Sequence, residues 1–273
     1  MFEEIRILIA LVGSLIGGLW DLKTTNIPDF LVFSMVITGF IINFAEGFLT
    51  GNYSNLTGAL LYGGIFLAFG LLMYYFGQWG GGDGGLLVAI AVLLPTLPAT
   101  VSLTSFPFSV SFFINTIFIG VAYSVVYSLI FTWKNQKVKH EFFQRIKKRE
   151  NYLPMIFILI LSLFFLAISR TIFYLSLLLL ALSVLQVFAK SISEGFYRKI
   201  PVSKLKTDDM IGEDIPNLKI YKKFIRGLTK DEIKKIKKMK KFVIIREGVR
   251  YGMVFPLSLL YTLLLGDLIL LFF

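Results

Sequence analysis

The sequence predicts an all-α polytopic membrane protein with about six to eight transmembrane helices and a small α+β cytoplasmic domain. Hydrophobic residues make up 56% of the 273 residues and charged residues only 16%, a composition typical of membrane-spanning chains. Several apolar runs reach the roughly 20 residues that a helix needs to cross a bilayer. The basic residues are concentrated in segments beside these runs.

The apolar runs place the predicted transmembrane helices at 5–20, 30–49, 57–76, 84–102, 110–133, 152–168, 171–189 and 251–273. The first run follows two acidic residues and lacks a basic n-region and a cleavage site, so we expect a retained helix and not a signal peptide. Only Ser169-Arg170-Thr171 separates the sixth run from the seventh, so 152–189 is either two spans or one bent segment. Two spans are favoured because they return the flanking basic segments to one side of the membrane.

The basic charge predicts the orientation of the chain in the membrane. Of the 28 Lys and Arg residues, 7 lie in 134–151 and 18 in 190–250. Such clusters beside membrane spans mark the cytoplasmic face, which puts the N-terminus outside. Because the net charge of +11 comes from these clusters, we expect the lipid bilayer as a partner and no nucleic acid.

The expected organisation follows from the spans and the charge. It comprises five transmembrane helices in 1–133, a basic cytoplasmic loop at 134–151, a transmembrane hairpin at 152–189, a small cytoplasmic domain at 190–250 and a C-terminal transmembrane helix at 251–273. Within the small domain, Thr229 and Glu232 form a capping-box pattern. Apolar Ile233, Ile236 and Met239 recur at helical spacing behind it, and 242–245 is predicted to form a strand.

The composition excludes several kinds of active site. The chain contains no cysteine, which rules out disulfides, thiolate zinc sites and a cysteine nucleophile. A single histidine, His140, lies in a basic segment, so a histidine-based triad or a multi-histidine metal site is not expected. No cofactor fingerprint and no metal-ligand pattern is evident, and we expect neither a cofactor nor a metal.

Acidic residues in or beside the apolar runs are candidates for function, because an intramembrane carboxylate is costly. Glu46 and Asp267 lie toward the outer ends of their runs, where the side chain can reach water. Asp29 follows Pro28 and is expected to cap the second helix. These three are expected to have structural roles.

Asp21 and Asp83 form the predicted site. Asp21 ends the first run and Asp83 opens the fourth. The chain crosses the bilayer twice between them, so both return to the cytoplasmic side. Gly13 and Gly17 form a GxxxG pair, which lets the first helix approach a neighbour closely. The two carboxyls are therefore expected to meet.

The glycines of "GQWGGGDGG", residues 77–85, suggest how a substrate could reach Asp83. Glycine lets the backbone run close to other chains, and amides near a helix N-terminus are free to bind. Gly80 and Gly82 are therefore candidate substrate-binding positions. The alternative is a flexible loop in which Asp83 only caps the fourth helix.

A pair of close carboxyls supports peptide hydrolysis without a metal. The two groups share one proton because both cannot ionise comfortably at short distance. The ionised member then takes a proton from a water that attacks the peptide carbonyl, and the protonated member binds the carbonyl oxygen and helps the amine to leave.

Two motifs resemble a known family. Gly80-Gly81-Gly82-Asp83 fits the GxGD motif of membrane aspartic peptidases, and "WDLKTTNIPD" ends the first helix. Together they resemble the type IV prepilin peptidase family, in particular its archaeal preflagellin and prepilin peptidase branch. The resemblance covers the first four spans, and "REGVRYGMVFPLSLLYTLLLGD" is similar to the closing helix of archaeal members. It implies that Asp21 and Asp83 are the catalytic residues.

The resemblance also implies a substrate and a location. The expected activity is a membrane aspartic endopeptidase that removes a short basic leader from archaellin or type IV pilin-like precursors at the cytoplasmic membrane face. Bacterial relatives carry a cysteine-rich zinc segment and methylate the new N-terminus, whereas this chain has no cysteine, so peptidase activity alone is expected. The hairpin at 152–189 is additional to the six helices of a typical preflagellin peptidase, and archaellin and pilin both stay open as substrates.

Two other functions fit membrane carboxylates. An ion-coupled transporter uses them to relay protons or bind cations, but such folds commonly show internal repeats and midplane sites, and the sequence shows neither. A presenilin-like intramembrane protease shares the GxGD pattern, and its aspartates are expected deeper in the bilayer.

Overall fold

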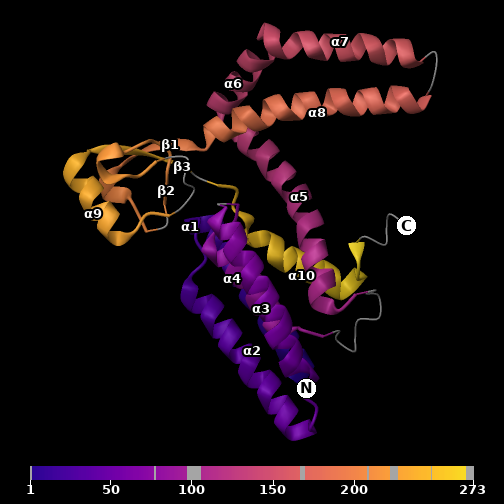
Figure 1. Ribbon diagram of the computed structural model, residues 1–273, viewed down its shortest axis with the longest axis vertical. Helices are drawn as coiled ribbons and strands as arrows, with labels where there is room; N and C mark the ends of the chain where they lie inside the picture. The colour runs from indigo at the N-terminus through magenta and orange to yellow at the C-terminus, as the bar shows by residue number, and fades with distance from the viewer. Residues whose placement is uncertain are drawn as a thin grey trace. The chain divides into compact units, whose positions relative to one another are not determined.

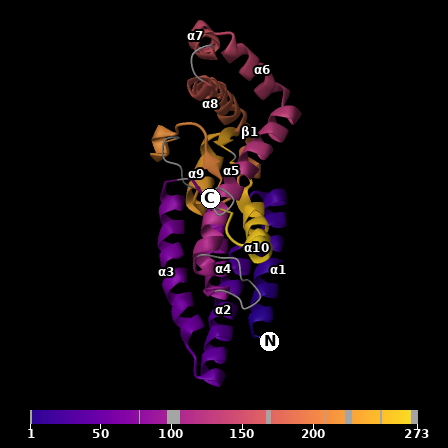
Figure 2. The same cartoon turned by 90° about the vertical axis from the view of Figure 1, so that its right-hand side faces the viewer.

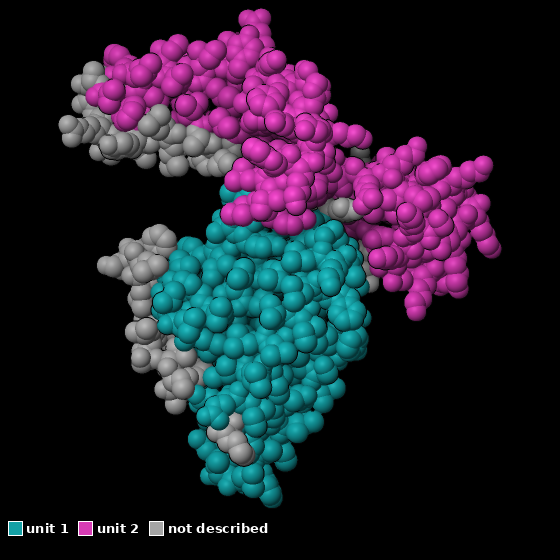
Figure 3. Space-filling view, turned by 180° about the vertical axis from the view of Figure 1, so that it is seen from behind, with its two compact units in different colours: residues 1–125, 223–227, 248–273 teal, residues 126–222, 228–247 magenta. Residues whose placement is uncertain are grey.

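The chain forms two compact units (Figure 3), comprising residues 1–125, 223–227 and 248–273 in unit 1 and residues 126–222 and 228–247 in unit 2. The structure is a computed structural model, and it describes residues 2–76, 78–96, 106–166, 170–207, 209–221, 227–246 and 248–268. Helices dominate both units, and the small sheet lies in unit 2. The predicted fold class, a helical polytopic membrane protein with a small α+β part, is confirmed.

Unit 1 is a helical bundle (Figures 1 and 2). It contains α1 (Phe2–Thr24), α2 (Asp29–Thr50), α3 (Ser54–Tyr75), α4 (Gly81–Leu93), the first part of α5 (Phe108–Lys134), the short 3-10 helix η3 (Tyr251–Met253) and α10 (Val254–Leu265). Four of these, α1, α2, α3 and α5, are long and apolar enough to cross a membrane. Shorter apolar helices lie at Gly81–Leu93 and Tyr251–Leu265. Large apolar side chains on the outside of the bundle, such as Phe33 and Ile41, are largely exposed, as expected of a surface that faces lipid.

Local signals explain where the first helices begin and end. Pro28 is the N-cap residue of α2, with an extended backbone (φ −66°, ψ 130°), and the helix starts at the next residue. Gly51 ends α2 with φ 72°, and its N–H donates to the Gly47 carbonyl at 2.9 Å. This left-handed ending is one that glycine adopts without strain.

Helix α4 is the central element of unit 1. It contacts α1, α2 and α3, and Leu86, Leu87 and Ile90 are completely buried. A helix that is apolar on all sides is expected to lie inside a bundle. The prediction of a span at 84–102 was too long at its C-terminal end, because α4 ends at Leu93, just before Pro95, and proline does not continue a helix. Residues 97–102 lie outside the described residues.

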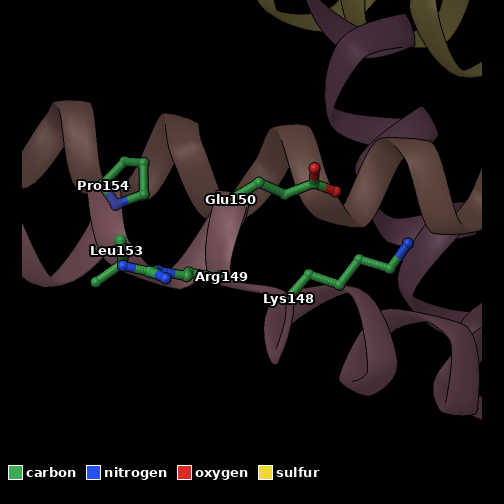
Figure 4. A pocket seen from close by; sticks show the side chains of 5 residues that line it. All are labelled: Lys148, Arg149, Glu150, Leu153 and Pro154. Atoms are coloured by element: carbon green, nitrogen blue, oxygen red, sulfur yellow. The ribbon is translucent and has the colours of Figure 1, made fainter.

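The helices of unit 2 include α6 (Gln136–Ile146), α7 (Arg149–Leu166) and α8 (Arg170–Gly195). The basic segment 134–151, expected to be a loop, thus contains a helix, and Val138 is buried in it. Helices α7 and α8 pack side by side (Figure 1). Lys148, Arg149, Glu150, Leu153 and Pro154 line a hollow at the start of α7 (Figure 4). That 152–189 crosses the membrane twice stays a prediction.

The sheet of unit 2 has three antiparallel strands in the order β1-β3-β2. They are β1 (Tyr197–Pro201), β2 (Met210–Ile211) and β3 (Phe242–Arg246), accompanied by α9 (Lys230–Met239) and the 3-10 helices Val202–Lys204 and Pro216–Leu218. The predicted strand at 242–245 and the capping box of Thr229 and Glu232 are confirmed. Ile233 and Ile236 are buried in the core of this unit, but Met239 is exposed, so the predicted apolar face was one residue too long.

Candidate active site

Asp21 lies in the last turns of α1 and is buried, with 7% of its surface exposed. Its Oδ2 accepts a hydrogen bond from the Gly252 N–H at 2.9 Å. The approach is so close that a Cβ on residue 252 would lie 2.8 Å from the Asp21 Cβ. Glycine at 252 therefore lets backbone from the C-terminal part of the chain reach this carboxylate.

Asp83 lies in the first turn of α4, and its side chain is half-buried. Its Oδ2 accepts a hydrogen bond from the N–H of Gly80, the N-cap residue, at 2.9 Å. A carboxylate at this place interacts favourably with the positive end of the helix dipole. Asp83 thus helps to start α4, as the capping alternative predicted, and this leaves its other oxygen for further interactions.

The structure brings Asp21 and Asp83 into one site. Asp21, at the end of α1, accepts a hydrogen bond from Gly252, and the adjoining Tyr251 packs on Trp79, four residues before Asp83 at the start of α4. The contact of these helices depends on Gly17, because a Cβ there would lie 3.2 Å from the Leu86 side chain of α4. Gly13, the other glycine of the GxxxG pair, lies against Met35 of α2.

The glycines at the start of α4 are mainly packing positions. A Cβ on Gly82 would lie 2.5 Å from the Cβ of Ile27, a Cβ on Gly84 3.1 Å from the Cα of Gly70, and a Cβ on Gly85 2.6 Å from Val32. Three different neighbours therefore meet this one helix turn.

Gly80 and Gly82 offer less free main chain than the sequence suggested. The Gly80 N–H is already taken by Asp83, and Ile27 covers Gly82. A substrate-binding role for these two residues stays a prediction, and a bound peptide would have to use other groups of this turn.

Sequence reasoning missed the aromatic residues of this region. The ring centroids of Trp79 and Tyr251 are 5.7 Å apart, and those of Trp79 and Phe255 are 5.8 Å apart. The Tyr251 hydroxyl donates to the Thr116 carbonyl at 3.3 Å, and Tyr251 also interacts electrostatically with Asp83. One signal for Tyr251 is present in the sequence, an Arg-Tyr-Gly triplet just before an apolar run, but it does not reveal which helix that triplet contacts.

Two expectations about the discounted acids were wrong. Asp29 is the first residue of α2, where Pro28 is the N-cap and no side-chain cap bond forms; instead Asp29 lines a cavity of about 410 Å³ together with Gly81. Asp267 is buried, with 4% exposed, and does not reach water. Glu46 pairs with Arg6 at 2.5 Å.

No cluster of three or more acidic, histidine or cysteine side chains suited to a metal ion occurs within the described ranges. The donors near Asp21 and Asp83 are backbone N–H groups, which orient carboxylates and do not bind cations. The arrangement therefore supplies two oriented carboxyl groups beside the aromatic rings of Trp79, Tyr251 and Phe255.

Residues 8–125 match the model of the type IV leader peptidase family, and this stretch of the chain is similar to that family. The match covers most of α1, all of α2, α3 and α4, and the part of α5 that lies in unit 1, so it includes Asp21 and Asp83. The family resemblance predicted from the motifs is confirmed.

Three archaeal proteins are similar to the chain. The prepilin peptidase EppA of Methanothermobacter thermautotrophicus is 26% identical over 148 residues, which are 50% of this chain and 38% of that protein. The preflagellin peptidase of Methanocaldococcus jannaschii is 32% identical over 93 residues, or 33% of this chain and 38% of that protein. The preflagellin peptidase of Methanococcus voltae is 30% identical over 90 residues, or 32% and 37%. The chain thus spans less than two fifths of the length of each relative.

Proposed function

We propose that the protein is a membrane aspartic endopeptidase that removes the short basic leader from archaellin or type IV pilin-like precursors. The observation that carries this proposal is that one segment reaches both acids: Gly252 donates to Asp21, and the adjoining Tyr251 packs on Trp79, four residues before Asp83. Both lie within the stretch that matches the type IV leader peptidase family. The substrate class is supported by the names of the similar proteins, a prepilin peptidase and two preflagellin peptidases.

The geometry suits a water-mediated hydrolysis. The ionised carboxylate of the pair removes a proton from a water molecule, and the water oxygen attacks the carbonyl carbon of the scissile peptide bond. The protonated carboxyl donates a hydrogen bond to the carbonyl oxygen, and its proton passes to the departing amine as the C–N bond breaks. The Gly252 and Gly80 N–H groups fix one oxygen of each carboxyl, which leaves the second oxygen of each for water and substrate. The shared proton belongs to the pair, because two coupled groups titrate together.

The proposed location is the cytoplasmic membrane face. The basic clusters at 134–151 and 190–250 favour a cytoplasmic position for both segments. Counting spans back from them puts the N-terminus outside, and the end of α1 and the start of α4 inside. A precursor whose leader is in the cytoplasm and whose apolar segment is in the membrane would then meet Asp21 and Asp83 at the boundary.

The test is cleavage of an archaellin or pilin precursor in membranes that contain Asp21→Asn or Asp83→Asn. Each variant is expected to lose at least about 100-fold in rate, since one general acid or base typically contributes that much. The amide keeps the size of the carboxyl, so insertion in the membrane should be unchanged. Asp29→Asn, at a residue that shares a cavity with Gly81 and Gly82, should cleave at the normal rate, and loss of cleavage in this variant would show that Asp29 is the first acid in place of Asp21. Normal processing by either active-site variant would overturn the proposal.

A further inference from the structure

We propose that the segment Arg250-Tyr251-Gly252 is a third component of the active site, in which Arg250 and Gly252 are positioning residues for Asp21. This inference rests on the proposed peptidase function, and it adds residues that lie beyond the stretch matching the family, 8–125. The segment immediately precedes α10 and is the part of the C-terminal region that reaches the carboxyl pair.

Gly252 contacts the carboxylate directly. Its N–H donates to the Asp21 Oδ2 at 2.9 Å, and both groups are buried. A charge-assisted hydrogen bond of this kind is stronger than a neutral one, so it fixes the orientation of the acceptor. Any side chain at 252 would collide with Asp21, because a Cβ would be 2.8 Å from the Asp21 Cβ and 3.1 Å from its Oδ2.

Arg250 holds the end of the helix that carries Asp21. Its guanidinium donates a hydrogen bond to the Leu22 carbonyl, one residue beyond the carboxylate, and its charge interacts with Asp21. A cation near the C-terminal end of a helix also interacts favourably with the helix dipole. Because the half-buried Arg250 side chain is hydrogen-bonded to the backbone next to Asp21, movement of this end of α1 relative to Arg250 is resisted.

The segment is itself held in place by neighbouring helices. The Tyr123 hydroxyl of α5 donates to the Arg250 carbonyl at 2.8 Å. On α1, a Cβ on Gly18 would lie 3.0 Å from the Gly252 carbonyl oxygen, so this helix also needs a glycine at the contact. Tyr251 packs on Trp79 and interacts electrostatically with Asp83. The segment therefore contacts groups beside both members of the carboxyl pair.

A positioning role predicts a particular kinetic change. Arg250→Gln removes the charge and Gly252→Ala forces Asp21 to move, and each is expected to lower kcat at least about tenfold while KM changes less than about twofold. Arg250→Lys, which keeps the charge, should recover part of the lost kcat. The matched control is Lys23→Gln, which removes an exposed cation two residues from Asp21 and should leave kcat unchanged.

A second measurement does not depend on activity. The chain has no cysteine, so Leu22→Cys introduces a single thiol beside Asp21 while keeping the Asp21 carboxylate, and its alkylation rate by a maleimide reports how firmly this end of α1 is held. Added to this background, Gly252→Ala and Arg250→Gln should raise the alkylation rate at least about threefold, whereas Lys23→Gln should not.

The outcomes separate this inference from the proposed function. If Asp21→Asn and Asp83→Asn still cleave, the peptidase proposal fails, while the alkylation rates still test the positioning role. If Gly252→Ala and Arg250→Gln keep the normal kcat, or raise KM alone, the positioning role is overturned. If Arg250→Gln does not accumulate in membranes, Gly252→Ala alone decides, and normal kcat with a normal alkylation rate overturns the inference.

Discussion

Arg6 shows how a single residue organises the bundle at the end remote from Asp21. Its side chain is only 5% exposed, and Nη1 donates to Asn43 Oδ1 and Glu46 Oε2, both at 2.5 Å. Asn43 in turn donates to the Val92 carbonyl at 2.7 Å, a carbonyl near the C-terminus of α4. The Arg6 network, formed by these three side chains, thereby joins α1, α2 and α4.

Removing one partner of this network should destabilise the protein. Arg6→Met leaves the Glu46 charge without its cation, and breaking a buried pair in this way typically costs about 3–5 kcal/mol. The double change Arg6→Met with Glu46→Gln should cost less, because no unpaired charge remains. Thermal unfolding in detergent measures both Tm values. A single variant as stable as the double variant would show that the pair contributes little.

At the scale of the element, the contact between α3 and α4 depends on glycine. A Cβ on Gly70 of α3 would lie 3.0 Å from the Cα of Gly84 of α4, so the two backbones touch. Backbone contacts of this kind are typical of membrane helices that pack through small residues. Gly64, on the same helix, has no atom within 4 Å of its Cβ position.

These two glycines provide a matched pair of substitutions. Gly70→Ala should lower the Tm, because the added methyl group must push two backbones apart. Gly64→Ala should leave the Tm unchanged or raise it slightly, since alanine favours a helix over glycine by about 0.5–1 kcal/mol. Unfolding of the two variants in the same detergent gives the comparison, and equal Tm values would contradict the proposed close packing.

Some features of the elements could be predicted from the sequence alone, and others could not. Span counting predicted that Asp21 and Asp83 lie on one side of the membrane, because the number of crossings between them does not depend on where each helix ends. The capping box of Thr229 and Glu232 could also be predicted, because its two residues lie only three positions apart in the sequence. The contact of Gly252 with Asp21 was not predictable, because it joins residues 231 positions apart and leaves no periodic pattern in the sequence.

Failures at single residues have equally physical causes. Asp29 matched the pattern of a helix cap, yet Pro28 takes the N-cap position and Asp29 starts the helix. Asp267 was expected near water because it lies close to the end of an apolar run, but tertiary packing buries it. The glycines before and after Asp83 suggested an open loop, whereas Gly84 and Gly85 pack against α3 and α2 and Gly82 packs against Ile27.

At the scale of the whole molecule, the orientation in the membrane rests on charge. The basic segments 134–151 and 190–250 favour the cytoplasm, while the turn between α2 and α3 carries no Lys or Arg. The two exposed residues Asn52 and Lys235 lie in segments for which opposite sides are expected.

Cysteine labelling tests this orientation directly, since the natural chain has no thiol. A membrane-impermeant maleimide added to intact cells should label Asn52→Cys and leave Lys235→Cys unlabelled until the membrane is opened. Ser169→Cys should be labelled from outside if 152–189 forms two spans. Labelling of Lys235→Cys in intact cells would show that the topology is the reverse of the proposed one, and the active site would then not lie at the cytoplasmic face.

The bond between Asp83 and the Gly80 N–H has a mechanical consequence. It is strongest when the carboxylate is ionised, because a neutral acid is a weaker acceptor and a weaker partner for the helix dipole. Each time Asp83 gains a proton, the first turn of α4 is held less firmly, and each time it loses the proton the turn is tightened again. Proton uptake at this one side chain would therefore be accompanied by fraying of the helix start beside it.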